Sequence, residues 1–191
     1  DKKAVAQAIT DEACKEAGYD SMEAAAEDGT AFVFMGHGTS HTANVTYDQM
    51  QSQMDNLGFK NAFIGTVEGE PEDTECQAVI AKVKDAGFKK VVLRPLMVVA
   101  GDHANNDMAG DDDDSWKSQF NASGAFDSVD CQIAGLGRIE AVEDLYVEHT
   151  KAAIDSLGTA DTAEETTDDT AEAADDTTDG AEEVTDDSAA E

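Results

Sequence analysis

The sequence is poor in basic residues, with 12 lysines and arginines against 43 aspartates and glutamates and a formal net charge of −31. Nucleic acids and anionic membrane surfaces attract proteins through basic groups that displace counterions. This excess of acid therefore argues against a nucleic-acid-binding protein and against a protein that binds a membrane surface. It favours a cation or a positively charged partner.

Cysteines and long apolar runs are also scarce. The three cysteines, Cys14, Cys76 and Cys131, lie far apart and form no C-x-x-C pair. This spacing argues against a disulfide framework, and we expect ordinary packed thiols. No stretch approaches the roughly 20 apolar residues that a transmembrane helix needs, so we expect no membrane insertion. The chain begins at Asp1 without a basic and apolar leader, and we expect it to be part of a longer protein.

Apolar runs alternate with amphipathic stretches over most of the remaining sequence. We expect strands at 31–35, 62–67, 91–99 and 129–134, and helices at 3–17, 47–57, 71–87, 116–120 and 139–157. Continuous apolar strands that alternate with helices are typical of a parallel sheet covered on both faces. The sequence therefore predicts a small three-layer α/β sandwich.

The composition changes after Gly158. All 12 basic residues lie at or before Lys151, whereas 14 of the 43 acids lie within 159–191, mostly among Thr and Ala. Such a segment is too polar and too charged to bury a core. We expect an N-terminal helix and linker at 1–29, an α/β domain with a metal site at 30–158, and a disordered acidic tail at 159–191 that acts as a solvating spacer.

Residues of the kinds that bind metals follow three of the expected strands. His37 follows the first strand, Glu68 the second and His103 the third, each with a glycine nearby. Because ligands bind outside the carboxyl ends of strands in an open parallel sheet, we expect all three side chains at one edge. Two imidazoles and one carboxylate suit Co²⁺, Ni²⁺, Fe²⁺ or Zn²⁺ and leave coordination positions open. One histidine at a strand end is more often packed than metal-bound, so the prediction depends on the coincidence of three.

Three segments resemble the anaerobic sirohydrochlorin cobaltochelatase family: Phe34–Thr39 with His41, Gly65–Gly69, and Pro95–Lys117. The similarity covers roughly residues 30–156 and resembles the C-terminal half of that family's two-domain chelatase fold. It implies that His37, Glu68 and His103 are the metal ligands and that His37 is also the proton acceptor. It also implies insertion of Co²⁺, or alternatively Fe²⁺ or Ni²⁺, into sirohydrochlorin during anaerobic cobalamin biosynthesis, with no organic cofactor.

Sirohydrochlorin is a polycarboxylate, so an acidic protein needs local donors for its acetate and propionate groups. We expect substrate contacts from Gly38, Thr39, His41 and Gly101, because the glycines let a flat ligand approach the main chain. We expect His41 to touch substrate or solvent rather than metal. Backbone amides near Ala43 and the Arg94 side chain are further candidates for binding carboxylates.

The resemblance leaves several alternatives open. The family's N-terminal half is absent from this sequence, so we expect either a missing half or a second copy to complete the substrate cleft. A metal or tetrapyrrole carrier without turnover is the main alternative, whereas a hydrolytic zinc enzyme is disfavoured because the sequence has no H-E-x-x-H helix. The family implies a cytoplasmic location. The alternative is an exported or envelope-associated protein with the acidic tail as a spacer.

Overall fold

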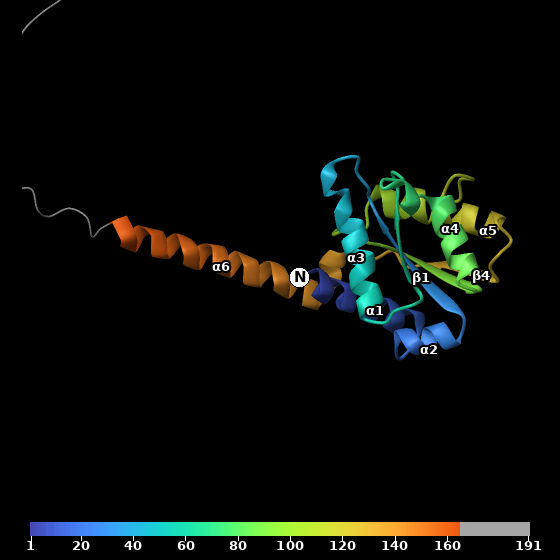
Figure 1. Ribbon diagram of the computed structural model, residues 1–191, viewed down its shortest axis with the longest axis horizontal. Helices are drawn as coiled ribbons and strands as arrows, with labels where there is room; N and C mark the ends of the chain where they lie inside the picture. Colours follow the sequence, from blue (N-terminus) through green and yellow to red (C-terminus); the bar gives the residue numbers. More distant parts are fainter. Residues whose placement is uncertain (165–191) are drawn as a thin grey trace, which may run out of the picture. The chain divides into compact units, whose positions relative to one another are not determined.

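The computed structural model describes residues 1–164, with side chains up to residue 157, and Figure 1 shows how the elements are arranged. Within this part of the chain the strands are β1 (Thr30–Gly36), β2 (Ala62–Thr66), β3 (Lys90–Pro95) and β4 (Ser128–Cys131). The α-helices are α1 (Lys2–Ala17), α2 (Met22–Glu27), α3 (Val45–Asn56), α4 (Cys76–Asp85), α5 (Trp116–Ala122) and α6 (Glu140–Glu164). Short 3-10 turns lie at η1 (Thr42–Asn44), η2 (Glu72–Thr74) and η4 (Leu136–Arg138), and η3 (His103–Met108) is a π-helix.

The four strands form one parallel sheet in the order β2-β1-β3-β4. Strand β1 is central, because Phe32 aligns with Ala62 of β2 on one side and with Val92 of β3 on the other. The chain therefore moves outward from β1 to β2 and then returns to the opposite side of β1. In such sheets the carboxyl ends of the two strands at this reversal, here β1 and β3, flank a crevice that binds ligands.

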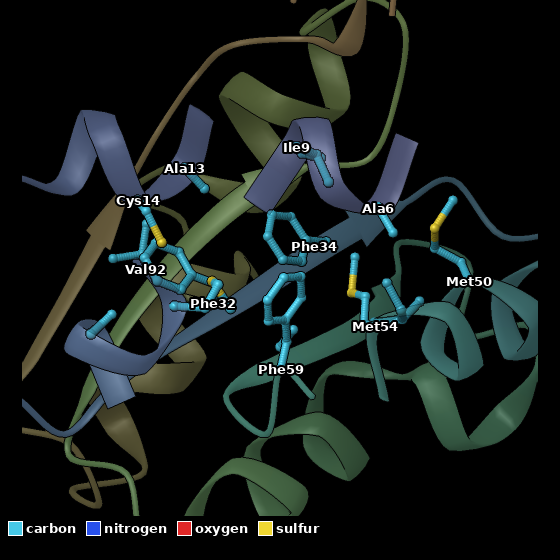
Figure 2. Packing of buried hydrophobic residues seen from close by; sticks show 14 of the residues in the cluster. Ala6, Ile9, Ala13, Cys14, Phe32, Phe34, Met50, Met54, Phe59 and Val92 are labelled. Atoms are coloured by element: carbon cyan, nitrogen blue, oxygen red, sulfur yellow. The ribbon is translucent and has the colours of Figure 1, made fainter. Parts of the chain in front are cut away.

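Alternate side chains of the strands enter two separate cores. Phe32, Phe34 and Val92 face the layer formed by α1, α2 and α3, where they meet Ile9 and Met54 (Figure 2). Val33, Met35 and Leu93 face the opposite layer, formed by α4 and α5. Figure 1 shows α1 and α3 on one side of the sheet and α4 and α5 on the other. The predicted three-layer α/β sandwich is confirmed.

The N-terminal helix is part of this core. Ala6, Ile9 and Ala13 of α1 are completely buried against the strands. The following segment, predicted only as a linker, contains the short helix α2, whose N-cap Ser21 accepts a hydrogen bond from the Ala24 amide at 3.2 Å. Residues 1–29 are thus packed on the domain through two helices.

Two predicted strands were too long. Strand β3 ends at Pro95 rather than at Val99, and β4 ends at Cys131 rather than at Ala134. The backbone carbonyls of Met97 and Val98 accept hydrogen bonds from the amides of 136 and 137 at 2.8 and 3.0 Å, so the two segments turn toward each other beyond the sheet. The apolar side chains that suggested longer strands are exposed instead: Val98 by 49%, Val99 by 72% and Ile133 by 44%.

The last helix continues beyond the predicted end of the domain, from Glu140 to Glu164. The rest of the predicted acidic tail, residues 165–191, lies outside the described residues. Within the described residues, α6 passes out of the compact unit formed by residues 1–151. Among the described residues, no helix combines the length and the apolar character needed to span a bilayer.

Candidate metal centre

His37 and His103 meet at the carboxyl edge of the sheet. His37 directly follows β1, and His103 begins η3 shortly after β3. Their ring centroids are 4.8 Å apart and the ring planes are inclined by 84°, which is an edge-to-face contact. His37 is exposed and the His103 side chain is 38% exposed, so both rings remain accessible from solvent. The fold therefore brings two of the three predicted ligands, His37 and His103, together at the β1/β3 crevice, and their binding of a metal stays a prediction.

Both imidazoles form a hydrogen bond within the protein through Nδ1. Nδ1 of His37 lies 2.9 Å from the carbonyl oxygen of Gly38, and Nδ1 of His103 lies 2.6 Å from Oδ2 of Asp107. A carbonyl oxygen and an ionised carboxylate can only accept, so Nδ1 carries the proton in both neutral rings. Each ring therefore has its lone pair on Nε2, the nitrogen that has no protein partner among the described residues.

Two glycines give the His37 loop its shape. Gly38 has a φ of +92°, and a Cβ there would lie 3.0 Å from Cβ of both Thr66 and Glu68. Its amide donates to the hydroxyl of Tyr47 at 2.8 Å, and a Cβ on Gly36 would strike the same tyrosine ring. These glycines are therefore required by contacts within the protein. At Gly101, in contrast, a Cβ would meet nothing within 4 Å.

Glu68 follows β2 and is tied to the first histidine through the backbone, since its amide donates to the carbonyl of His37 at 2.9 Å. Its exposed side chain lines an open pocket of about 390 Å³ together with Glu75, Asp107 and Asp114. Within the described residues, no three His, Cys, Asp or Glu side chains are clustered closely enough to hold a metal. The fold thus brings the two imidazoles into contact and links the Glu68 backbone to His37 at the adjacent strand end, while the role of Glu68 as a third ligand stays a prediction.

No helix was predicted between the expected strand at 91–99 and the expected helix at 116–120, but this segment contains the π-helix η3. Ala104 and Met108 are completely buried and anchor the turn on the core. Asn106 donates to Asp102 at 2.6 Å and Asn105 to the Gly101 carbonyl at 2.7 Å, which ties the exposed side of the turn. π-Helical turns are rare and are often found at functional sites.

Asp107 was missed by the sequence reasoning. Its spacing of four residues from His103 was visible in the sequence, but it predicts a contact only on a helix. Since the segment was expected to be a loop, no contact was expected.

The other predicted substrate residues have local partners. Thr39 donates its amide to the Glu70 carbonyl at 3.3 Å and accepts the His41 amide at Oγ1. Nδ1 of His41 accepts the Ala43 amide at 3.1 Å and so caps η1. The Ala43 amide, a predicted anion donor, is therefore already used. Substrate contacts by Thr39 and His41 remain predictions.

Arg94 cannot bind a substrate carboxylate at this edge. Its side chain is only 1% exposed, and Nη1 donates to Glu16 of α1 and to Gln132, both at 2.7 Å. The guanidinium therefore links β3 to α1 and to the segment after β4 inside the protein. The sequence could not reveal this, because both partners are distant in the chain.

The three thiols are unsuited to metal binding at neutral pH. Burial is the main cause that raises the pKa of Cys14 to about 11, of Cys76 to about 12 and of Cys131 to about 11. A metal ligand must be a thiolate, and these groups stay protonated. The prediction of ordinary buried or half-buried free thiols is confirmed.

Comparison with known proteins gives one family match and several similar chains. The family model described as "Cobalt chelatase (CbiK)" matches residues 5–155. The sirohydrochlorin cobaltochelatase of Salmonella typhimurium is 43% identical over 122 residues, which are 64% of this chain and 44% of that protein. The sirohydrochlorin cobaltochelatase CbiKC of Nitratidesulfovibrio vulgaris is 35% identical over 129 residues, 66% of this chain and 43% of that protein. The chain thus spans less than half the length of either relative.

A solved structure shows the same fold. It is a putative cobalamin biosynthesis CbiX protein from Marinobacter aquaeolei, with a TM-score of 0.54 and 14% identity. The match covers 68% of this chain and 98% of that one. At this level of identity the likeness concerns the fold alone.

Proposed function

Because the chain belongs to the cobalt chelatase (CbiK) family, we propose that it inserts a divalent metal, Co²⁺ in the first instance, into sirohydrochlorin. The observation that carries this proposal is the edge-to-face pair of His37 and His103 at the carboxyl ends of β1 and β3. The names of the relatives from Salmonella typhimurium and Nitratidesulfovibrio vulgaris support the substrate and the metal.

The incoming metal would be held by Nε2 of both histidines. Imidazole nitrogen is a good donor for Co²⁺, Ni²⁺, Fe²⁺ and Zn²⁺, so the donor set does not select one of these metals. The Glu68 carboxylate would supply the third ligand and offset part of the metal's charge. Three protein ligands leave coordination positions open, and a metal that must be transferred to a ring needs such positions.

Insertion also requires that two pyrrole protons leave the ring. An imidazole can take up and release a proton near neutral pH, which makes a histidine beside the ring a suitable acceptor. His37 cannot hold a metal and a proton on Nε2 at the same time, so we assign it alternating roles. His103 would anchor the metal through the transfer, because its supporting partner is a carboxylate rather than a neutral carbonyl.

The substrate ring would lie along an apolar rim at the same edge. Three exposed side chains form this rim: Val98, Val99 and Ile133. They line a pocket of about 410 Å³, which Arg138 also lines. Within the described residues, the Arg138 guanidinium has no ion-pair or hydrogen-bond partner. A flat ring with peripheral carboxylates matches this combination, since the ring covers apolar side chains and a carboxylate pairs with arginine. We assign to Arg138 the carboxylate-binding role once expected of Arg94.

We propose that the opposite wall of the cleft comes from outside the described residues. The relatives are more than twice as long as the matched region, so either a further half of the protein or a second copy would close the cleft. Closure would exclude water and hold the ring over the two histidines.

The test is anaerobic absorbance of sirohydrochlorin with Co²⁺, which follows formation of the cobalt complex. Three samples are compared: the chain, its His37→Ala variant and a protein-free control that measures uncatalysed insertion. The proposal predicts acceleration that depends on His37. If the chain binds Co²⁺ without accelerating insertion, it is a carrier or lacks a necessary second wall, and the proposed activity of this chain is wrong.

A further inference from the structure

We propose that Asp107 is a positioning residue that fixes the tautomer and the orientation of the His103 ring and so keeps Nε2 available to the metal. This inference rests on the proposed role of His103 as a metal ligand. It assigns no direct contact between Asp107 and metal or substrate. Its basis is the short hydrogen bond of 2.6 Å between His103 Nδ1 and Asp107 Oδ2.

The surrounding turn holds this pair in place. His103 begins η3 and Asp107 lies four residues further along it, between the buried anchors Ala104 and Met108. Asn105 and Asn106 are tied back to the residues just before the turn. Both ends of the turn are thus fixed, so Asp107 is held against the ring although its own side chain is 46% exposed.

The carboxylate has two chemical effects on the ring. A neutral imidazole without a partner interconverts between two tautomers, and only the one protonated at Nδ1 has its lone pair on Nε2. An acceptor at Nδ1 selects that tautomer. A charged acceptor also makes Nε2 a stronger donor, and loss of such partners typically lowers metal affinity about 10- to 100-fold.

The simpler explanation is that Asp107 only forms an exposed ion pair that helps the turn. Asp102 provides a matched control, since it directly precedes the turn as its N-cap and accepts a hydrogen bond of 2.6 Å from Asn106, without a hydrogen bond to the ring. Asp102→Asn removes one negative charge from the start of the turn and leaves the His103 partner intact. Asp107→Asn removes the negative charge but keeps an amide oxygen that can accept from Nδ1. Asp107→Ala removes both the charge and the acceptor.

Two measurements on these full-chain variants decide the question. Ring ¹⁵N NMR of the metal-free protein reports which nitrogen of His103 carries the proton. Visible absorption of Co²⁺ reports its dissociation constant. We expect Asp107→Ala to lose the Nδ1–H tautomer and to bind Co²⁺ about 10- to 100-fold more weakly. Asp107→Asn should keep the tautomer and lose less affinity, and Asp102→Asn should behave like the parent in both measurements.

Unchanged tautomer and affinity in Asp107→Ala would overturn the inference, as would an equal loss of affinity in Asp102→Asn. The NMR measurement needs neither metal nor turnover. A tautomer that depends on Asp107 in a chain that inserts no cobalt would therefore support the positioning role while the proposed function fails.

Discussion

At the scale of single residues, the hydrogen bonds at Nδ1 decide which ring nitrogen of His37 and His103 can bind a metal. His37 and His103 both direct Nδ1 to a protein acceptor, so the metal must approach Nε2. His41, by contrast, uses Nδ1 to accept the Ala43 amide, so its proton lies on Nε2. His41 therefore differs in its protonated nitrogen from His37 and His103, a difference that the sequence does not show.

This difference predicts the outcome of two alanine substitutions. His103→Ala should weaken Co²⁺ binding by at least about 100-fold, because it removes a direct ligand and not only a supporting partner. His41→Ala should leave the affinity almost unchanged and serves as the matched control. Calorimetric titration with Co²⁺ measures both. Equal affinities for the His103→Ala variant and the parent protein would show that His103 is no ligand.

The cysteines should react slowly in the folded protein. Their pKa values of about 11 to 12 leave very little thiolate at pH 8, and the reactive species is the thiolate. Iodoacetamide labelling followed by mass spectrometry should be at least about tenfold slower for the folded chain than for the chain in urea. The folded state keeps these protons when unfolded thiols ionise, so the free energy of unfolding should fall as pH rises above about 8.5. Equal labelling rates in both states would contradict this account.

At the scale of secondary structure elements, the turn after β1 is the most constrained part of the site. Gly38 has a positive φ, and a Cβ there would lie 3.0 Å from Cβ of both Thr66 and Glu68. Gly58, after α3, has a φ of +85°, but a Cβ there would meet nothing within 4 Å. A side chain at either position would therefore meet similar backbone strain, but only at Gly38 would it also meet close neighbours.

Alanine substitutions at these two glycines should differ accordingly. Gly58→Ala should cost about 1–2 kcal/mol through left-handed backbone strain alone. Gly38→Ala should cost clearly more and should displace His37, so Co²⁺ affinity should fall as well. Urea unfolding and Co²⁺ titration of both variants test this. Equal losses of stability would mean that the β1 turn has room to relax.

Hydrophobic periodicity predicted most of the elements and the edge where the histidines meet. It failed where apolar residues are exposed. Val98, Val99 and Ile133 suggested longer strands, yet they lie on the apolar rim beyond the carboxyl ends of β3 and β4. It also failed where tertiary structure sets a local shape, because the π-helix η3 depends on burial of Ala104 and Met108. The contact between His103 and Asp107 follows from that helix and could not be predicted without it.

At the scale of the whole molecule, the exposed rim at the carboxyl edge is the surface that we propose for the substrate. The chain spans less than half of each relative. Its carboxyl edge displays apolar side chains and an arginine in an otherwise strongly acidic protein. The proposed substrate, a flat ring with peripheral carboxylates, would cover the apolar side chains and pair with the arginine.

Arg138→Gln should therefore weaken binding of metal-free sirohydrochlorin about tenfold or more, because a charge-assisted hydrogen bond is lost. Lys60→Gln is the matched control, since it removes one exposed positive charge at the opposite end of the sheet, between α3 and β2. Quenching of sirohydrochlorin fluorescence measures both affinities. Equal affinities for the two variants would show that Arg138 does not recognise the substrate.

Metal binding by this site requires that the imidazoles of His37 and His103 bind one metal together. X-ray absorption spectroscopy at the cobalt edge counts the imidazoles around Co²⁺ bound to the chain. We expect two imidazoles in the parent protein, one in His37→Ala and one in His103→Ala. A single imidazole in the parent, or a count that neither substitution changes, would contradict the claim.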